Sequence, residues 1–402
     1  MAQGAGTGHL GAGGRRSGAP PPPPTGAGLK APRPPTGAGR GLAPPAERMA
    51  MARVDGPIGD GLRLGMLVEI VDHPTLGGKL GQLVRHSLSE DTVEVCLTTG
   101  ATEEVKRQSV RAPAGYRRPG LGGEPASFDA LIGPLSQDDV VGEEIAACLF
   151  EKGFCVLRTC QKASEVASAV AVMRQKGDTG RLFRLPEEVE EGYLGAGARG
   201  KVAWLDAGNP DAPKNEVLDS SDAFISKLAA LIQPSCGDIV GMHVDERTPA
   251  LACLSLLDEE EAEYPPQDAD DSTLGDFLRT WKRSLLKVVH FMGPGTATVT
   301  LESTEENGAE SLPFKQDSVE ISAEPNTIIV FRTGAFRYGC SSEEECLSLS
   351  ANLLLHADSL AWGDWEGMDS AAWLMSGSGP PGPAGEQVNI VNMCTRLSCN
   401  WD

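Results

Sequence analysis

Two side chains that could bind a metal stand close together in the middle of the sequence, in the segment His243-Val244-Asp245. The surrounding residues predict two strands within 237–257, and side chains two positions apart on a strand share a face. An imidazole and a carboxylate on one face are two ligands of a 2-His-1-carboxylate site, which holds Fe(II) and leaves positions open for a cosubstrate and oxygen. The pair therefore predicts half of an iron site or, alternatively, a strand histidine that is hydrogen-bonded to Asp245 or Glu246.

A second distinctive stretch precedes this pair. Residues 188–195 read EVEEGYLG, and a short glycine-rich loop follows before residues 201–206 alternate in the manner of a strand. We expect a turn at residues 192–195 and a loop that leads into the strand. The positions that define the stretch are Glu188, Glu190, Gly192, Tyr193, Leu194 and Gly195.

These positions resemble the ExExGYLG signature found upstream of the ketosynthase in polyketide synthases of dinoflagellate algae. Residues 388–402 are similar to the first strand of a ketosynthase domain, and the catalytic residues of such a domain would lie beyond Asp402. The resemblance implies a non-catalytic accessory or docking region of a polyketide synthase. It also implies ketosynthase or acyl-carrier partners, and a homodimer as a further expectation.

A different resemblance bears on the iron pair. The segments LFEKGFCVLR at 149–158 and RGKVAWLD at 199–206 look like the opening helix and strands of 2-oxoglutarate/Fe(II) oxygenases of the prolyl-hydroxylase type. The resemblance implies a double-stranded β-helix that uses Fe(II) and 2-oxoglutarate to hydroxylate a small molecule or peptide. In that family a distal histidine follows a strand like residues 327–331, and an arginine about ten residues later binds the cosubstrate carboxylate bidentately.

The third metal ligand is the weak point of the oxygenase hypothesis. Tyr338 stands where the family has its distal histidine, and residues 346–349 offer no arginine. His290, inside the segment KVVHFM, and His356, at the end of LLLHA, are alternatives without a suitable arginine. An incomplete ligand set binds metal and cosubstrate poorly. The sequence therefore favours an accessory scaffold over an enzyme, with Tyr338 as a half-buried strand residue.

Charge and cysteine content limit the classes of partner. Lys and Arg total 35 against 56 for Asp and Glu, a formal net charge of -21, which disfavours DNA and anionic membranes. We expect no membrane span and no secretory signal, so the expected location is the cytoplasm or a plastid rather than the exterior. The ten cysteines lack disulfide or zinc spacing.

Composition divides the chain into five segments. Residues 1–57 are rich in Gly, Ala and Pro and predict a disordered tail. Residues 60–113 predict a small SH3-like barrel of the KOW or Tudor type, which raises a third possible function, a peptide- or RNA-binding adaptor. Residues 126–375 predict the β-helix domain, 376–387 a linker, and 388–402 the truncated start of a ketosynthase-like domain.

Hydrophobic periodicity gives the fold class of the main domain. We expect helices at 138–151, 163–175, 220–233 and 274–285, and strands at 153–157, 286–292, 296–301, 318–321, 327–331 and 347–355. This order predicts a mainly β fold with flanking helices, in which two sheets close as a jelly-roll-like sandwich.

Overall fold

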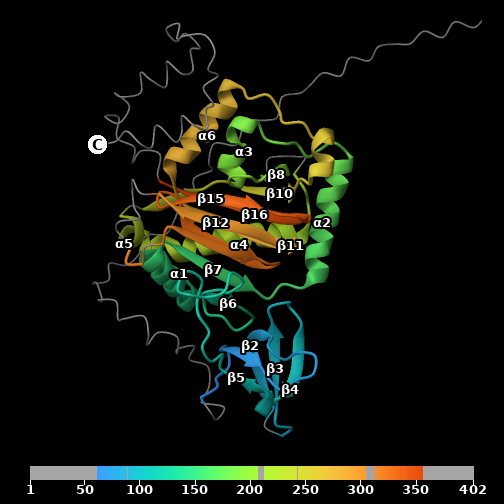
Figure 1. The fold of residues 1–402 in the computed structure, drawn as a ribbon, viewed down its shortest axis with the longest axis vertical. Helices are drawn as coiled ribbons and strands as arrows, with labels where there is room; N and C mark the ends of the chain where they lie inside the picture. The colour runs from blue at the N-terminus through green and yellow to red at the C-terminus, as the bar shows by residue number, and fades with distance from the viewer. Residues whose placement is uncertain are drawn as a thin grey trace, which may run out of the picture.

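The computed structural model describes residues 61–87, 89–206, 212–241, 243–304, 312–314 and 316–355. These residues form a small β-sheet domain, which lies at the bottom of Figure 1, and a larger body of sheets and helices above it. The expected tail, the linker at 376–387 and the segment 388–402 lie outside the described residues.

The small domain is one antiparallel sheet with the strand order β4-β3-β2-β1-β5. Its strands are β1 (Leu67–Ile70), β2 (Leu80–Ser87), β3 (Thr92–Leu97), β4 (Thr102–Lys106) and β5 (Val110–Arg111), with the 3-10 turn η2 (Arg107–Ser109) before β5. Val68, Leu83 and Val95 are fully buried in its core. The pairings leave β4 and β5 at the two edges, so closure into an SH3-like barrel stays a prediction.

The main sheet of the large body has the order β6-β7-β14-β11-β16-β10-β8, and β9 pairs with the end of β16. Its strands are β6 (Ala130–Ile132), β7 (Phe154–Thr159), β8 (Gly200–Leu205), β9 (Val244–Arg247), β10 (Ala250–Ser255), β11 (Ser284–Pro294), β14 (Thr327–Arg332) and β16 (Cys346–Leu355). A second, antiparallel sheet lies over one of its faces with the order β13-β12-β15. It consists of β12 (Ala297–Ser303), β13 (Ser318–Ala323) and β15 (Phe336–Ser341).

Helices cover the other face of the main sheet (Figure 1). They are α1 (Asp138–Lys152), α2 (Ala163–Asp178), α4 (Glu216–Ile232) and α5 (Cys236–Val240), while α3 (Glu187–Leu194) and α6 (Asp271–Arg283) lie near the β8 edge. Two short 3-10 turns are η3 (Gln233–Ser235) and η4 (Asp258–Glu263).

The central strands are buried on both faces, which explains their continuous apolar runs. In β11, Val288 points to the helices and Val289 to the second sheet. Ile328 and Ile329 of β14 divide in the same way. The result is a mainly β body that resembles a jelly roll with helices on one side. The described residues contain no helix long and apolar enough to cross a membrane.

One prediction for the central stretch is wrong. Residues 187–194 form the helix α3 where a turn was expected at residues 192–195. Pro186 precedes the helix, and its first turn carries Glu187, Glu188 and Glu190, which favour a helix N-terminus because of the helix dipole. The helix ends at Gly195, whose φ of 105° is a conformation that side chains with a Cβ rarely adopt.

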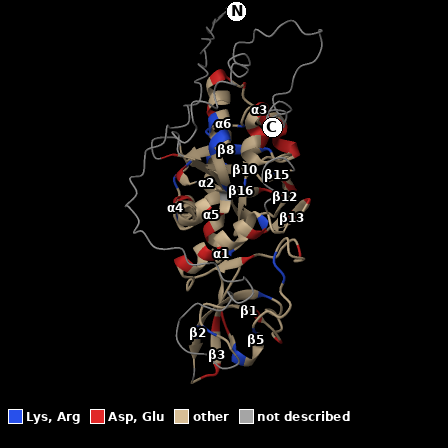
Figure 2. Ribbon diagram, turned by 90° about the vertical axis from the view of Figure 1, so that its left-hand side faces the viewer, with Lys and Arg blue, Asp and Glu red and all other residues tan. Residues whose placement is uncertain are grey.

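The small domain is held to the large body by side chains that cross between them. The amide of Gln82 on β2 accepts a hydrogen bond from the Leu135 backbone N–H at 2.9 Å and donates one to Ser136 Oγ at 3.1 Å. Gln82 is buried. Figure 2 shows both basic and acidic segments on the small domain, in agreement with the mixed charge of its sequence.

Candidate functional site

A cavity of about 290 Å³ lies between the main sheet and the second sheet. Cys253, Phe291 and Ser348 contribute from the main sheet, Tyr338 from the second sheet, and Tyr193 from the end of α3. The interior of a sandwich is normally filled by large apolar side chains. This space, which is partly open to solvent, is therefore the first candidate for a binding site.

The cavity exists because two neighbouring strands present small side chains to the interior. In β16, Cys346, Ser348 and Ser350 point inward, while the alternate residues Leu347 and Leu349 pack against the helices. The pairing of β16 with β10 sets Cys253 opposite Ser348 and Leu251 opposite Ser350. Where large rings such as Phe331 face the second sheet, the interior is filled.

Tyr338 forms part of the cavity wall opposite these small residues. Its ring stacks on Phe331, with ring centroids 5.2 Å apart and an interplanar angle of 29°. The side chain is half-buried and borders the cavity, as the alternative interpretation of the sequence expects. Burial raises the pKa of Tyr338 well above its usual value, so the phenol is neutral at physiological pH.

Lys287 lies in the interior beside Tyr338. It shares the inward face of β11 with Val289, and its side chain is 4% exposed. Its Nζ donates hydrogen bonds to the Tyr193 carbonyl at 2.6 Å and the Gly192 carbonyl at 3.3 Å, and lies 5.0 Å from the Tyr338 ring centroid. No ion pair joins it to a carboxylate of the described residues. Burial lowers the pKa of Lys287 to about 8.

Two signature residues, Tyr193 and Leu194, line the cavity next to Lys287, and the others pack behind them. Glu190 is buried and pairs with Arg184 at 3.0 Å. Tyr193 makes edge-to-face contacts with Trp204 and Phe277, at centroid distances of 5.5 and 5.2 Å. Of the other signature residues, Leu194 is buried and Glu188 is half-buried. Gly192 and Gly195 lie close to aromatic rings. The motif therefore has a structural role.

The structure does not bring the predicted iron ligands together. His243 and Asp245 are exposed at the edge strand β9 and do not line the cavity. His290 points to the helix-covered face of the main sheet, away from Tyr338, and His356 lies outside the described residues. No group of three metal-binding side chains in the described ranges includes His243 or Asp245. Iron binding by this pair stays a prediction.

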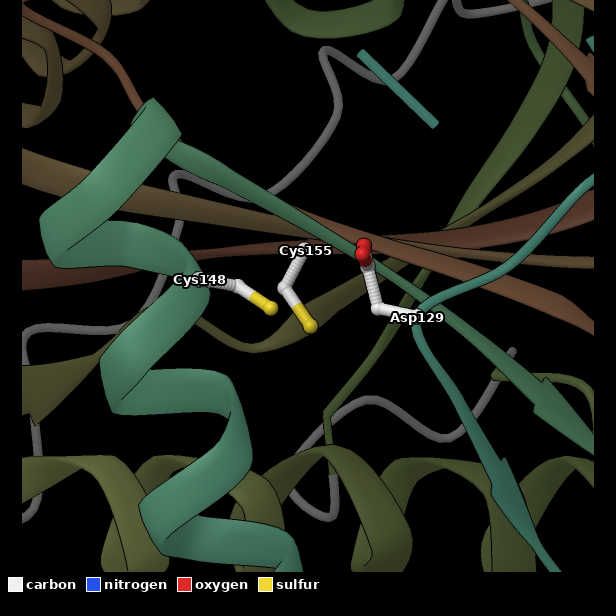
Figure 3. A group of neighbouring side chains, drawn as sticks. All are labelled: Asp129, Cys148 and Cys155. Carbon is white, nitrogen blue, oxygen red and sulfur yellow. The ribbon is translucent and has the colours of Figure 1, made fainter. Parts of the chain in front are cut away.

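One such group lies elsewhere, at the start of the large body. Asp129, Cys148 and Cys155 are buried with their ligand atoms within 4.8 Å of one another (Figure 3). Lys152 Nζ, however, donates to both carboxylate oxygens of Asp129 at 2.7 and 2.9 Å, and the Val156 N–H donates to one of them at 2.8 Å. The lysine ammonium already supplies the positive charge, so this group is an internal ion pair and not a metal site.

Comparison with known proteins identifies fold neighbours only. No family model and no curated protein matches the chain. A Trichoplax adhaerens prolyl hydroxylase, solved with a hypoxia inducible factor peptide fragment, is 12% identical with a TM-score of 0.37 over 54% of this chain and 90% of that one. A Pseudomonas putida prolyl-4-hydroxylase is 18% identical with a TM-score of 0.33 over 54% and 100%. A Burkholderia pseudomallei protein of the 2OG-Fe(II) oxygenase family is 16% identical with a TM-score of 0.31 over 57% and 96%.

The side chains that line the cavity do not form a 2-His-1-carboxylate iron site. They include no imidazole, and their one carboxylate belongs to Asp258. The thiols of Cys253, Cys340 and Cys346 are protonated, because burial raises their pKa values, that of Cys346 to about 12. The cavity's arginine, Arg199, pairs with Glu261 at 2.6 Å. The side chains lining this cavity thus provide neither a 2-His-1-carboxylate set nor an unpaired arginine for a cosubstrate carboxylate.

The sequence singled out Tyr193, Leu194 and Tyr338 but not the other residues that shape this cavity. Lys287, Ser348 and Ser350 lie in segments that simply read as strands. Two features of the sequence could have indicated them. One is a lysine inside the apolar run LLKVVHFM, and the other is the alternation of serines with leucines in β16. Both break the pattern expected for a strand buried on two faces.

Proposed function

We propose that the large body is a non-catalytic domain that binds a small organic molecule between its two sheets, without an iron-ligating triad. The main support for this proposal is the composition of the cavity wall, which contains serine, cysteine and tyrosine side chains but no histidine. Small-molecule sites combine apolar surface with convergent polar groups, and this wall contains both kinds of side chain.

The wall also indicates the chemistry of the ligand. Val289 and Phe291 offer apolar contact, while the hydroxyl groups of Ser348, Ser350 and Tyr338 offer hydrogen bonds. The Lys287 ammonium lies just behind Tyr338 and favours electron-rich oxygen atoms nearby. We infer a ligand with an apolar part and a carbonyl or carboxylate group.

A cavity-filling variant tests this function. Ser348→Leu combined with Ser350→Leu places two large apolar side chains into the space and should abolish binding of fragments that wild type selects from a library of small carbonyl compounds. Ser318→Leu, at an exposed position of β13, is the matched control. Thermal shift and ligand-observed NMR measure the effect, which we expect to exceed about tenfold in affinity. Equal binding by the filled variant would refute the site.

The oxygenase alternative has its own assay. Anaerobic protein is titrated with Fe(II) in the presence of 2-oxoglutarate, and a weak visible charge-transfer band is sought. We expect no band at saturating iron, because the cavity lacks the required ligands. A band that His243→Ala abolishes would overturn the non-catalytic proposal and establish iron binding at His243 and Asp245.

The accessory role in polyketide synthesis is a finer proposal, supported by the sequence resemblances at 188–195 and 388–402. We propose a ketosynthase or acyl-carrier protein as the partner. Because the signature residues are mostly buried, the partner would contact other surfaces of the domain. A pull-down with purified candidate partners tests it, and failure to retain either class would count against the role.

A further inference from the structure

A second cavity, of about 300 Å³, lies on the helix-covered side of the main sheet. It is bordered by the end of β7, by α2 and by α4, next to the contact between the two domains. There the Gln161 carbonyl accepts a hydrogen bond from Asn326 Nδ2 at 2.8 Å, and Gly100 of the small domain lies against Gln161. Clefts at domain boundaries are common ligand sites.

His290 of β11 borders this cavity and is 3% exposed. Both of its ring nitrogens are buried without a hydrogen-bond partner among the described residues. Each unpaired buried polar atom reduces the stability of the folded state by about 1–3 kcal/mol, so the two nitrogens destabilise the fold as long as they have no partner. Burial also lowers the pKa of His290 to about 4, so the neutral ring offers one donor and one acceptor.

The other lining residues indicate what the imidazole could bind. Hydroxyl groups come from Thr159, Ser220 and Ser221, an amide comes from Gln161, and an aromatic ring comes from Phe224. Glu165 is the one charged residue among the described lining residues. Several hydroxyl groups beside one aromatic face suit a molecule that has polar edges and an apolar C–H face, and a single acid disfavours an anion.

We propose that this cavity binds a small uncharged polyhydroxy compound, a sugar or cyclic polyol of monosaccharide size. The ligand ring lies against Phe224, its hydroxyl groups bond to the serine, threonine and glutamine side chains, and His290 turns about its Cβ–Cγ bond to pair a ring nitrogen with a ligand hydroxyl. The site is separate from the cavity between the sheets, so neither proposal depends on the other.

The test follows the His290 ring in the full chain by NMR of ring-labelled histidine. Glucose, myo-inositol and glycerol are titrated as probes. We expect a saturable shift of the His290 ring signals with glucose or myo-inositol and a much weaker one with glycerol, which has no ring face. His290→Leu should weaken probe binding about tenfold, the value of roughly one hydrogen bond with good geometry.

Further variants separate the site from general loss of structure. Ser220 is exposed at the rim, so Ser220→Trp should block entry while the protein stays folded. Ser318→Leu, at an exposed position of β13 that lines neither cavity, should bind the probes as wild type does. Absence of a saturable shift with all three probes, or equal binding by Ser220→Trp, would show that the cavity holds only water and overturn the proposal.

Discussion

The ammonium of Lys287 lies inside a β-sandwich with two backbone carbonyls as its hydrogen-bond partners. Moving a charge out of water is expensive, and carbonyl dipoles compensate only part of the cost. Lys287 joins the inward face of β11 to the end of α3. We therefore assign it a positioning role, in which it fixes the cavity wall at the expense of stability.

Lys287→Met should change how stability depends on pH. The folded-state pKa of Lys287, about 8, lies below the unfolded value of about 10.4, so the unfolded state binds more protons between these values. Wild-type stability should therefore rise relative to the variant across this window, by about 1 kcal/mol per pH unit. Below pH 8 both states are protonated and the burial cost, about 3 kcal/mol, is present in full.

Urea unfolding of both proteins at several pH values measures this difference. Buried cysteines and tyrosines far from Lys287 are common to both proteins and cancel, whereas the Cys340 thiol interacts with the Lys287 charge and contributes to the difference. Lys227→Met, at a half-exposed lysine of α4, is the control and should follow wild type. Parallel curves for wild type and Lys287→Met would show that Lys287 is not a buried cation.

At the scale of elements, α3 is the part of the fold that sequence patterns describe least well. Its glycines read as a turn, yet Gly192 is helical and a Cβ there would lie 2.4 Å from the Phe277 ring. Close approach to a ring of another helix is a tertiary constraint that local propensity does not contain. Tyr338 lies on a strand, as expected, but the sequence did not indicate the bounds of β15, which its pairing with β12 decides.

Other elements were predictable because their pattern reflects burial. The helices α1, α2, α4 and α6 and the strands β11 to β14 and β16 lie close to the expected ranges. The cavity was not predictable, because it depends on the register that sets Cys253 beside Ser348. His243 and Asp245 do not lie in the cavity with Tyr338 for a related reason. The spacing of two residues on a strand predicts that they share a face, but not which part of the fold that face contacts.

Gly192→Ala tests the contact between α3 and α6. The added methyl group gains about 1 kcal/mol of helix propensity but collides with the buried Phe277 ring, and overpacking of this kind costs about 1–3 kcal/mol. We expect a net loss of about 1 kcal/mol in chemical denaturation and partial recovery when Phe277→Leu is added. Gly334→Ala, in open space, should be neutral. A Gly192→Ala protein more stable than wild type would refute the close packing.

At the scale of the whole molecule, side chains of the small domain couple it to the large body, among them Gln82 and the half-buried Leu67 and Leu80. Gln82 is the most buried of them, 2% exposed, and its amide spans the boundary. The second cavity lies beside the same boundary, where Gln161 contacts the small domain. Docking of the small domain should therefore influence both cooperativity and access to that cavity.

Gln82→Ala should uncouple the domains. The substitution leaves the Leu135 N–H without its acceptor and removes a buried amide, a loss of about 1–3 kcal/mol at the boundary. We expect calorimetric unfolding to change from one transition to two, because each domain keeps its own core. Gln233→Ala, whose amide donates a hydrogen bond to the Val244 carbonyl at 2.9 Å within the large body, is the matched control and should keep the wild-type profile. A single unshifted transition in Gln82→Ala would mean that the boundary is held by backbone and apolar contacts instead.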